Sequence, residues 1–365
     1  MRSESIGTAR RLGAESAASP ARVLFVGNFL SARGGRRAVA EELEDRLAAR
    51  GWSVTLTSRV LSRPARVLDM LWTTARRRAD YDLAHLDVFS GTAFVWAEAA
   101  ALLLDALGKP WVATLRGGEL PSFARRHPRR VRGLLARARA VAAPSRYLQA
   151  ELGVWRGDVA LVPNAIDLSR YLFRARTQPA PRLVWVRAFH AMYRPELAPA
   201  VVAALAGAFA DVRLAMIGPD KGDGSLAATV RAAEALGVAD RVEIVPGVPK
   251  AEVPAHLGRG DVFLNTTSVD NVPVSVLEAL ACGLCVVSTN AGGLPYLLDD
   301  GRDALLVPEG DAAAMAGAVA RVLREPGLAE RLSRNGRETA AACDWAEVLP
   351  LWERFLQPPE SGGAR

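Results

Sequence analysis

Short apolar runs alternate with amphipathic stretches along most of the chain from Arg22 onward. Short, nearly continuous apolar runs are typical of strands that are buried on both faces, and the stretches between them have helical periodicity. This alternation predicts βα units that feed a parallel sheet. The chain is therefore expected to be an α/β protein.

The alternation falls into two series, which a Pro-rich polar stretch at 174–181 separates. Candidate strands of the first series lie at 22–29, 52–58, 82–88, 110–117, 140–145 and 159–167. Those of the second lie at 182–189, 212–220, 241–247, 262–268, 285–290 and 304–308. The length of 365 residues suits two domains of ordinary size. We predict domains at 22–173 and 182–345 joined by a linker at 174–181, with a ligand cleft beyond the strand carboxyl ends.

The two ends of the chain differ in pattern. Residues 1–21 are rich in Ser, Ala and Arg without an apolar run, so we expect a disordered tail and not a signal peptide. Residues 346–365 are expected to form a C-terminal helix and tail. A helix face that includes Trp345 and Trp352 needs a cover. It packs either across both domains near the linker or on the second domain alone.

Composition excludes several classes of protein. No apolar stretch approaches the roughly 18 residues that span a bilayer. The three cysteines are too few for a disulfide framework and indicate a reducing compartment, so we expect the cytoplasm. Cys282 and Cys285 lack the second pair or histidine cluster of a zinc site. Since no metal-ligand cluster is evident in the sequence, no resident metal or cofactor is expected.

The most informative segment runs from Asp270 to Glu278 and leads into a candidate strand at 285–290. The apolar spacing predicts a buried helix that begins near Val272. A helix start offers amide groups and a positive dipole to an anion. Asp270 and Glu278 add carboxylates that accept hydrogen bonds from sugar hydroxyls, so the segment is predicted to bind an anionic ligand with a sugar.

Two acids at this spacing, with Pro273 as the fourth residue, resemble the donor-binding signature of the family 4 retaining glycosyltransferases, which usually has Glu at both ends. The resemblance implies the GT-B fold, in which two Rossmann-like domains face a central cleft. It implies transfer of a sugar from a nucleotide-sugar donor to a saccharide or lipid-linked acceptor. By the same resemblance, Glu278 holds the ribose, and Asp270 holds the donor sugar with the amides of Asn271 and Val272.

Further matches follow in the order of the family. They are Gly34 and Gly35 after the first strand, the turn ending at Ser145, the segment 163–167, the pair Gly292 and Gly293, and the strand ending at Pro308. Two glycines let a backbone approach a phosphate or sugar closely, although a simple turn has the same pattern.

Arg187 ends the first strand of the second domain, where the family places a cation on the donor pyrophosphate. Arginine suits this role because its guanidinium binds phosphate through two hydrogen bonds. A companion lysine usually follows, but this chain has Met192 there. Arg194 and Lys221 are the candidates to replace it, and either is equally compatible with a solvated loop charge.

The larger departure from the family is Arg116, which follows the fourth strand where a His-Gly pair is common. Arginine stabilises a leaving phosphate but cannot act as a general base, because its pKa lies above about 12. A front-face retaining mechanism needs no base there, since the departing phosphate accepts the proton of the acceptor. His85, in the third strand, either lines the acceptor side or has a structural role.

The charge of the chain is one-sided. Residues 1–170 hold 27 Lys and Arg against 16 Asp and Glu, whereas the remainder holds 19 against 23. The densest basic segment includes Arg126, Arg129 and Arg130. It either contacts an anionic membrane, which predicts a peripheral enzyme on the inner face of the cytoplasmic membrane, or is a solvated helix. No nucleic-acid partner is expected, because no recognisable module or aromatic set accompanies the charge.

Other α/β functions fit less well. A dinucleotide oxidoreductase is not expected, because no G-x-G-x-x-G follows any candidate strand. A nucleotide-sugar epimerase of the same architecture stays open, and so does a non-catalytic regulator that binds a nucleotide sugar. The hypothesis of a non-catalytic regulator rests on Arg116, because the family commonly has a His-Gly pair at this position.

Overall fold

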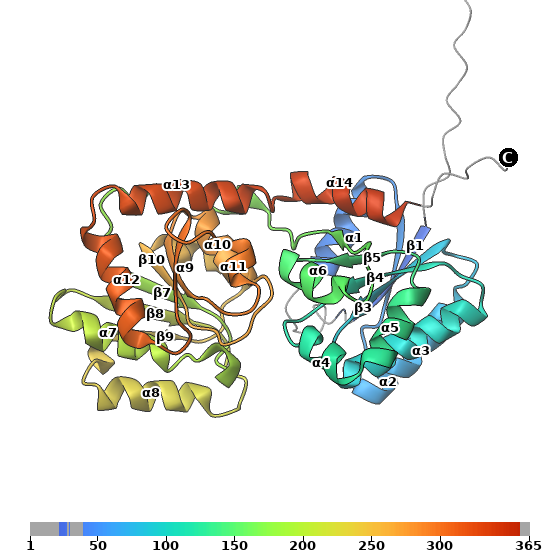
Figure 1. Cartoon of the computed structure of the whole chain (residues 1–365), viewed down its shortest axis with the longest axis horizontal. Helices are drawn as coiled ribbons and strands as arrows, with labels where there is room; N and C mark the ends of the chain where they lie inside the picture. Colours follow the sequence, from blue (N-terminus) through green and yellow to red (C-terminus); the bar gives the residue numbers. More distant parts are fainter. Residues whose placement is uncertain (1–21, 28, 30–38, 358–365) are drawn as a thin grey trace, which may run out of the picture.

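The computed structural model describes residues 22–27, 29 and 39–357, which form two α/β lobes (Figure 1). The predicted tail at 1–21 and the end of the chain beyond Gln357 lie outside the described residues. Each lobe contains a six-stranded parallel sheet. The prediction of two Rossmann-like domains is confirmed.

The first sheet has the strand order β2-β1-β3-β4-β5-β6. Its strands are β1 (Arg22–Val26), β2 (Ser53–Thr57), β3 (Leu83–Val88), β4 (Trp111–Leu115), β5 (Val141–Ala143) and β6 (Ala160–Leu161). The second sheet has the order β12-β11-β10-β7-β8-β9. Its strands are β7 (Arg182–Val186), β8 (Arg213–Ile217), β9 (Val242–Val245), β10 (Val262–Asn265), β11 (Cys285–Thr289) and β12 (Ala304–Val307). Every candidate strand of the sequence contains one of these strands.

Helices cover both faces of each sheet. In the first lobe, one face packs against α2 (Arg63–Arg76), α3 (Thr92–Ala106), α4 (Leu120–Arg126), α5 (Pro128–Arg137) and α6 (Arg146–Gly153). The other face packs against α1 (Val39–Ala49). In the second lobe, α7 (Leu197–Ala206), α8 (Ser225–Ala235) and α12 (Ala312–Arg324) cover one face. The other carries α9 (Val253–Gly258), α10 (Val274–Ala281) and α11 (Leu294–Leu297), while α13 (Leu328–Ala341) contributes to both cores.

The last helix, α14 (Trp345–Leu356), returns to the first lobe. Trp345 and Trp352 are buried against strands β1 and β3 beside α1. Figure 1 shows α13 and α14 running end to end across both lobes. The helix therefore belongs to the first domain, which neither predicted placement stated. The reason is that α1 leaves part of that face of the first sheet open, and the apolar stripe of α14 fills it.

Two chain segments cross between the lobes side by side. The amide of Ile166 donates to the carbonyl of Cys343 at 2.9 Å, and the amide of Trp345 donates to the carbonyl of Ile166 at 3.0 Å. The segment at 174–181, predicted as the linker, lies on the second lobe. Its Arg176 is buried and binds Asp261 at 3.2 Å. The crossing therefore lies before the predicted linker.

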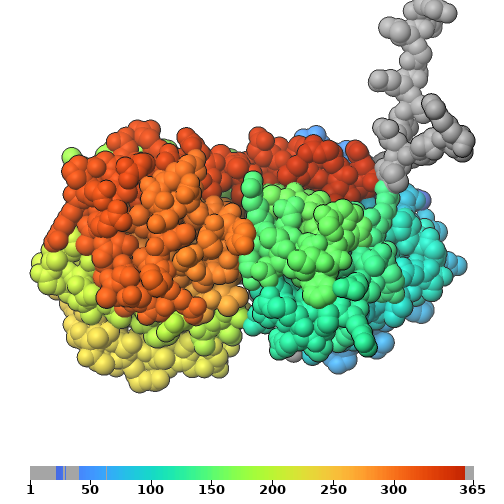
Figure 2. Space-filling model, viewed as in Figure 1, coloured from blue at the N-terminus to red at the C-terminus, as the bar shows by residue number. Residues whose placement is uncertain are grey.

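The two lobes are in contact (Figure 2), and several of the contacts come from loops at the strand carboxyl ends. Ser145, at the start of α6, donates a hydrogen bond to Asn271 in the loop after β10. Asn164, after β6, donates to the carbonyl of Val272 at 3.3 Å. Lys250 of the second lobe pairs with Glu42 of α1 at 3.3 Å. No helix in the described part of the chain is long and apolar enough to cross a bilayer.

Candidate active site

The loop that leads into α10 carries the first cluster of polar groups. Pro273 precedes the helix, which starts at Val274, two residues after the predicted start near Val272. The Asp270 carboxylate accepts a hydrogen bond from the amide of Asn271 at 2.8 Å and forms an ion pair with Arg187. Burial raises the pKa of Asp270, and the charge of Arg187 opposes that rise. The structure thus brings the predicted sugar-binding and pyrophosphate-binding side chains into direct contact.

Arg187 is held on several sides in a position that suits an anionic ligand. It follows β7, pairs with Asp270 and stacks on the ring of Tyr193 with its Cζ 4.2 Å from the ring centroid. Its Nε is buried and makes no hydrogen bond to the described residues. A buried donor without an acceptor costs roughly 1–3 kcal/mol, which a phosphate oxygen would offset. Arg187 is therefore the best-placed cation for a pyrophosphate.

Two glycines allow the close contacts of this loop. A Cβ on Gly293 would overlap the backbone of Asn271, and the amide of Gly293 donates to the carbonyl of Asp270 at 2.9 Å. A Cβ on Gly118, from the first lobe, would lie 3.2 Å from the carbonyl carbon of Asp270. Glycine at both positions lets the 270–273 loop touch backbone from each lobe.

Glu278 lies in the second turn of α10 and is buried. The hydroxyl of Tyr171 donates a hydrogen bond to its Oε1 at 2.8 Å. Burial, together with the charge of Glu278, raises the pKa of Tyr171. Tyr171 was not predicted, since one aromatic residue in a loop has no sequence pattern that marks it as a hydrogen-bond donor to a buried carboxylate.

The two candidates for the second cation lie in loops at the same edge of the second sheet. Arg194, after β7, has φ of 44°, a conformation that is uncommon for any residue except glycine. Its guanidinium pairs with Glu196 at 3.7 Å and Glu309 at 3.8 Å. Lys221 follows β8 and is exposed. Because left-handed backbone in a non-glycine residue points to a functional constraint, Arg194 is the stronger candidate.

Arg116 is fixed between two polar groups of the first lobe. Its Nε donates to Asp87 at 2.9 Å, and its Nη1 donates to Asn164 at 3.1 Å. Since Asn164 also donates to the carbonyl of Val272, this chain of contacts reaches the loop 270–273, which is the candidate donor loop. Asn164 belongs to the segment 163–167 that matches the family, whereas Asp87 was not predicted, although a carboxylate near the carboxyl end of a buried strand is a signal that marks it.

His85 does not line the acceptor side, so that prediction is corrected. The residue is 1% exposed in the middle of β3. Its Nε2 lies 2.7 Å from the hydroxyl of Thr114, and its ring packs against Phe25 and Trp352. Burial lowers the pKa of His85 to about 4, so the ring is neutral at ordinary pH. It belongs to the core beneath α14.

The predicted basic residues lie on α4 and α5. Arg126 and Arg129 are exposed. Arg130 pairs with Glu98 of α3 at 3.0 Å and lies over the ring of Phe94. Its charge is therefore already used to hold α5 against α3, and only the other two are available to a partner.

The remaining sequence candidates add no site. Gly34 and Gly35 lie outside the described residues. Burial raises the pKa of Cys282 to about 11 and of Cys285 to about 12, so both thiols stay protonated and unreactive. No group of three or more metal-ligating side chains occurs within the part of the chain that the structure describes.

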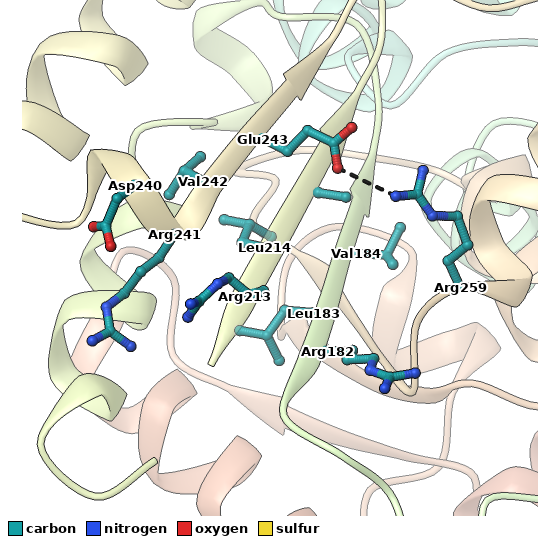
Figure 3. Close-up of a pocket in the computed structure, with 11 residues that line it drawn as sticks. Arg182, Leu183, Val184, Arg213, Leu214, Asp240, Arg241, Val242, Glu243 and Arg259 are labelled. Atoms are coloured by element: carbon teal, nitrogen blue, oxygen red, sulfur yellow. Dashed lines mark ion pairs between the residues drawn. The ribbon is translucent and has the colours of Figure 1, made fainter. Parts of the chain in front are cut away.

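A cavity lies at the amino-terminal edge of the second sheet, opposite the edge that carries the loop 270–273 (Figure 3). Its volume is about 490 Å³, and four arginines line it, including Arg213 and Arg241. These two donate to loop carbonyls at 2.8 Å and 2.7 Å, and Arg259 pairs with Glu243 at 3.6 Å. Three of the four arginines are thus engaged in local structure, and the cavity lies away from the donor loop.

Both halves of the chain match glycosyltransferase family models. Residues 30–170 match the model described as Glycosyltransferase Family 4, and residues 175–339 match the model described as Glycosyl transferases group 1. The border between the two models coincides with the crossing between the lobes.

Curated relatives share shorter segments. The GDP-mannose-dependent alpha-(1-6)-phosphatidylinositol monomannoside mannosyltransferase of Mycolicibacterium smegmatis is 34% identical over 36% of this chain and 35% of its own length. The D-inositol 3-phosphate glycosyltransferase of the same organism is 30% identical over 53% of this chain and 46% of its own length. The matched segments thus span less than half of either relative.

Solved structures share the fold over nearly the whole chain. Sucrose-phosphate synthase from Thermosynechococcus elongatus has a TM-score of 0.77 at 19% identity, covering 92% of this chain and 98% of its own. Anabaena HepE, solved with UDP and glucose, has a TM-score of 0.72 at 16% identity and covers 92% and 99%. Because the two family models account for most of the sequence and the lobes have the GT-B arrangement, the chain belongs to the group 1, family 4 glycosyltransferases.

Proposed function

We propose that the protein is a retaining glycosyltransferase that moves a sugar from a nucleotide-sugar donor to a saccharide or lipid-linked acceptor. The observation that carries the proposal is the ion pair of Arg187 and Asp270 at the start of α10. We assign Arg187 to the pyrophosphate and Asp270 to the sugar because the two side chains are in contact, and Glu278 lies one helix turn further on. The names of the relatives, one of them GDP-mannose-dependent, and the UDP and glucose bound in HepE agree with such a donor.

The arrangement supports a front-face reaction. The bond between the anomeric carbon and the leaving phosphate oxygen breaks, and Arg187 with the start of α10 stabilises the charge that develops on the phosphate. The acceptor hydroxyl attacks from the same face, and its proton passes to the departing phosphate oxygen. Arg116, held by Asp87 and Asn164, adds a donor from the first lobe. No protein base is required, which suits an arginine at this position.

The proposal is tested by a donor screen followed by product analysis. Thermal shift measurements with UDP-, GDP- and ADP-sugars should reveal one class that stabilises the protein, by roughly 2.7 kcal/mol at one hundred times Kd. Incubation of that donor with candidate acceptors should then yield a product with the anomeric configuration of the donor. An isomerised donor without acceptor would indicate an epimerase, and binding without turnover would indicate a regulator. An inverted product would contradict the retaining mechanism.

We expect turnover to be independent of divalent metal, because Arg187 and the amides at the start of α10 neutralise the pyrophosphate. Addition of EDTA should leave the rate of nucleoside diphosphate release unchanged within experimental error. Apo protein dialysed against chelator serves as the second measurement. Loss of activity in EDTA, with recovery on adding magnesium or manganese, would contradict the role given to Arg187.

We also propose that the protein docks peripherally on the anionic inner face of the cytoplasmic membrane through the outer helices of its first lobe. Leu68 and Trp72 on α2 are 69% and 65% exposed, and Leu102 on α3 is 59% exposed. An apolar groove of about 680 Å³ runs between α2 and α3. The basic helix α5 lies on the other side of α3, to which Arg130 ties it. Apolar side chains beside arginines match the interior and headgroups of an anionic lipid surface.

Two double variants should separate the contributions to membrane binding. Leu68→Ser with Trp72→Ser removes the apolar contact. Arg126→Glu with Arg129→Glu reverses two charges that form no ion pair with any other residue in the described part of the chain. Each charge near an anionic surface contributes about 1 kcal/mol, so the second variant should lose more than tenfold in affinity. Co-sedimentation with phosphatidylglycerol vesicles and with neutral vesicles, at low and high salt, measures both effects.

The matched control reverses exposed arginines of the second lobe, Arg182→Glu with Arg231→Glu, and should sediment like the parent chain. Donor binding should be unchanged in all three variants, since none of these residues lies at the donor loop. Equal sedimentation of the parent and both first-lobe variants at low salt would refute docking and leave a soluble saccharide as the acceptor.

A further inference from the structure

We propose that Tyr171 is a positioning residue that orients the Glu278 carboxylate toward the ribose of the donor nucleotide. The inference rests on the proposed function, because it assigns how that donor site recognises ribose hydroxyls. Tyr171 lies in the segment that crosses between the lobes, whereas Glu278 lies on α10, and their side chains meet inside the second lobe.

The contact between the two side chains is buried and directional. Tyr171 is 4% exposed and Glu278 is 5% exposed, and the tyrosine hydroxyl donates to Oε1 at 2.8 Å. An ionised carboxylate has about four acceptor sites, so a bond to tyrosine leaves acceptor capacity for sugar hydroxyls. A hydrogen bond to a charged acceptor is about twice as strong as one between neutral groups. The tyrosine therefore limits rotation of the carboxylate while it occupies one of the acceptor sites on Oε1.

The hydroxyl of Tyr171 keeps its proton under all ordinary conditions. Burial is the largest cause that raises the pKa of Tyr171, and the charge of Glu278 raises it further. The phenol is therefore a permanent donor, and the carboxylate it faces is always the acceptor. This fixed polarity is what an orienting contact requires.

Tyr171 is itself held in place by its surroundings. It follows the 3₁₀ turn Leu168–Arg170, and its amide donates to the carbonyl of Leu168 at 3.2 Å. Its carbonyl accepts a hydrogen bond from Arg337 of α13 at 3.3 Å. The ring packs in the core that contains Leu277 of α10. A side chain with two rotatable bonds, fixed at both backbone groups and at the ring, gives the carboxylate a rigid support.

Tyr171→Phe isolates the hydroxyl, because the ring and its packing are retained. The variant should bind a ribonucleoside diphosphate about tenfold more weakly than the parent chain. Its affinity for a 2′-deoxy or 3′-deoxy analogue that lacks the hydroxyl bound by Glu278 should stay nearly unchanged. The ratio of ribo to deoxy affinity is thus the quantity that a merely structural tyrosine would not alter.

The experiment is calorimetric titration of the full chain with UDP, GDP and ADP, followed by the 2′-deoxy and 3′-deoxy forms of the nucleotide that binds. Tyr81→Phe is the matched control, since Tyr81 is also buried and its hydroxyl donates to the carbonyl of Thr74 at 3.0 Å in the first lobe. This control should keep the parental ratio. On a Glu278→Ala background, Tyr171→Phe should have no further effect on binding.

The outcomes distinguish the inference from the function on which it rests. A parent chain that binds none of the three nucleotides overturns the proposed function, and the inference with it. A parent that prefers the ribonucleotide, together with a folded Tyr171→Phe variant that has the same preference, overturns the inference alone. A reduced preference that Tyr81→Phe does not share supports it.

Discussion

Arg187→Ala is expected to lower kcat for sugar transfer by about a hundredfold to a thousandfold, the usual effect of removing one donor that stabilises developing charge. The variant loses the cation next to the pyrophosphate. It also removes the charge that opposes the rise of the Asp270 pKa, so that this partly buried carboxyl binds a proton more readily and accepts fewer hydrogen bonds from the sugar. Steady-state release of nucleoside diphosphate measures the change.

The control for this variant is Arg182→Ala, which removes the same side chain from the other end of β7. It should retain parental kcat and KM, because Arg182 is exposed at the amino-terminal edge of the sheet. Arg187→Lys should recover only part of the rate, since an ammonium cannot form the paired hydrogen bonds of a guanidinium. Parental turnover in Arg187→Ala would contradict the assignment and favour Arg194 or Lys221 as the pyrophosphate cation.

Trp352→Ala is expected to lower the free energy of unfolding by about 3–5 kcal/mol, the range observed for large aromatic residues removed from a core. The indole is 1% exposed and lies against the rings of His85 and Phe355. Its removal leaves a cavity between α14 and the first sheet. Chemical denaturation, followed by tryptophan fluorescence and by circular dichroism, measures the loss.

Trp72→Ala is the matched control, because the same substitution is made at a residue that is 65% exposed on α2. Its effect on the free energy of unfolding should stay within about 0.5 kcal/mol. If α14 were only loosely attached, the two variants would have equal stability. A large loss for Trp352 alone would show that packing of α14 contributes to the stability of the first lobe.

The fold was predictable because a strand buried on both faces carries an unbroken apolar run, as in the segment of Leu183 to Val186. The start of α10 was predictable because Pro273 and the apolar spacing after it mark a helix start. The surface against which α14 packs could not be predicted from the sequence. An apolar stripe shows that one face of a helix is buried, but it does not show which surface covers that face. In the same way, the sequence alone does not show that Arg176 pairs with the buried carboxylate of Asp261. Because of this contact, the segment predicted as a linker packs on the second lobe.

The positions of some polar side chains could be predicted from the sequence, and those of others could not. Arg187 and Asp270 lie together as their strand-end positions indicated. His85 also lies on a strand of the first sheet, but in the middle of β3 and not at its carboxyl end. Neighbouring side chains along a strand point to opposite faces, and the side chain of His85 points into the core. Tyr171 had no signal, since its role depends on a contact with a helix that lies far away in sequence.

The double crossing at Ile166 and Cys343 has a consequence for exchanging parts between such enzymes. The second lobe is an insertion within the first, placed between β6 and α14, and not simply the latter half of the gene. A chimera made with one junction near 174 would combine the α14 of one parent with the β1 and α1 of another, where Trp345 and Trp352 would meet foreign neighbours. A cassette with two junctions, one near each crossing, would exchange the whole second lobe and keep the native α14 cover of the first lobe.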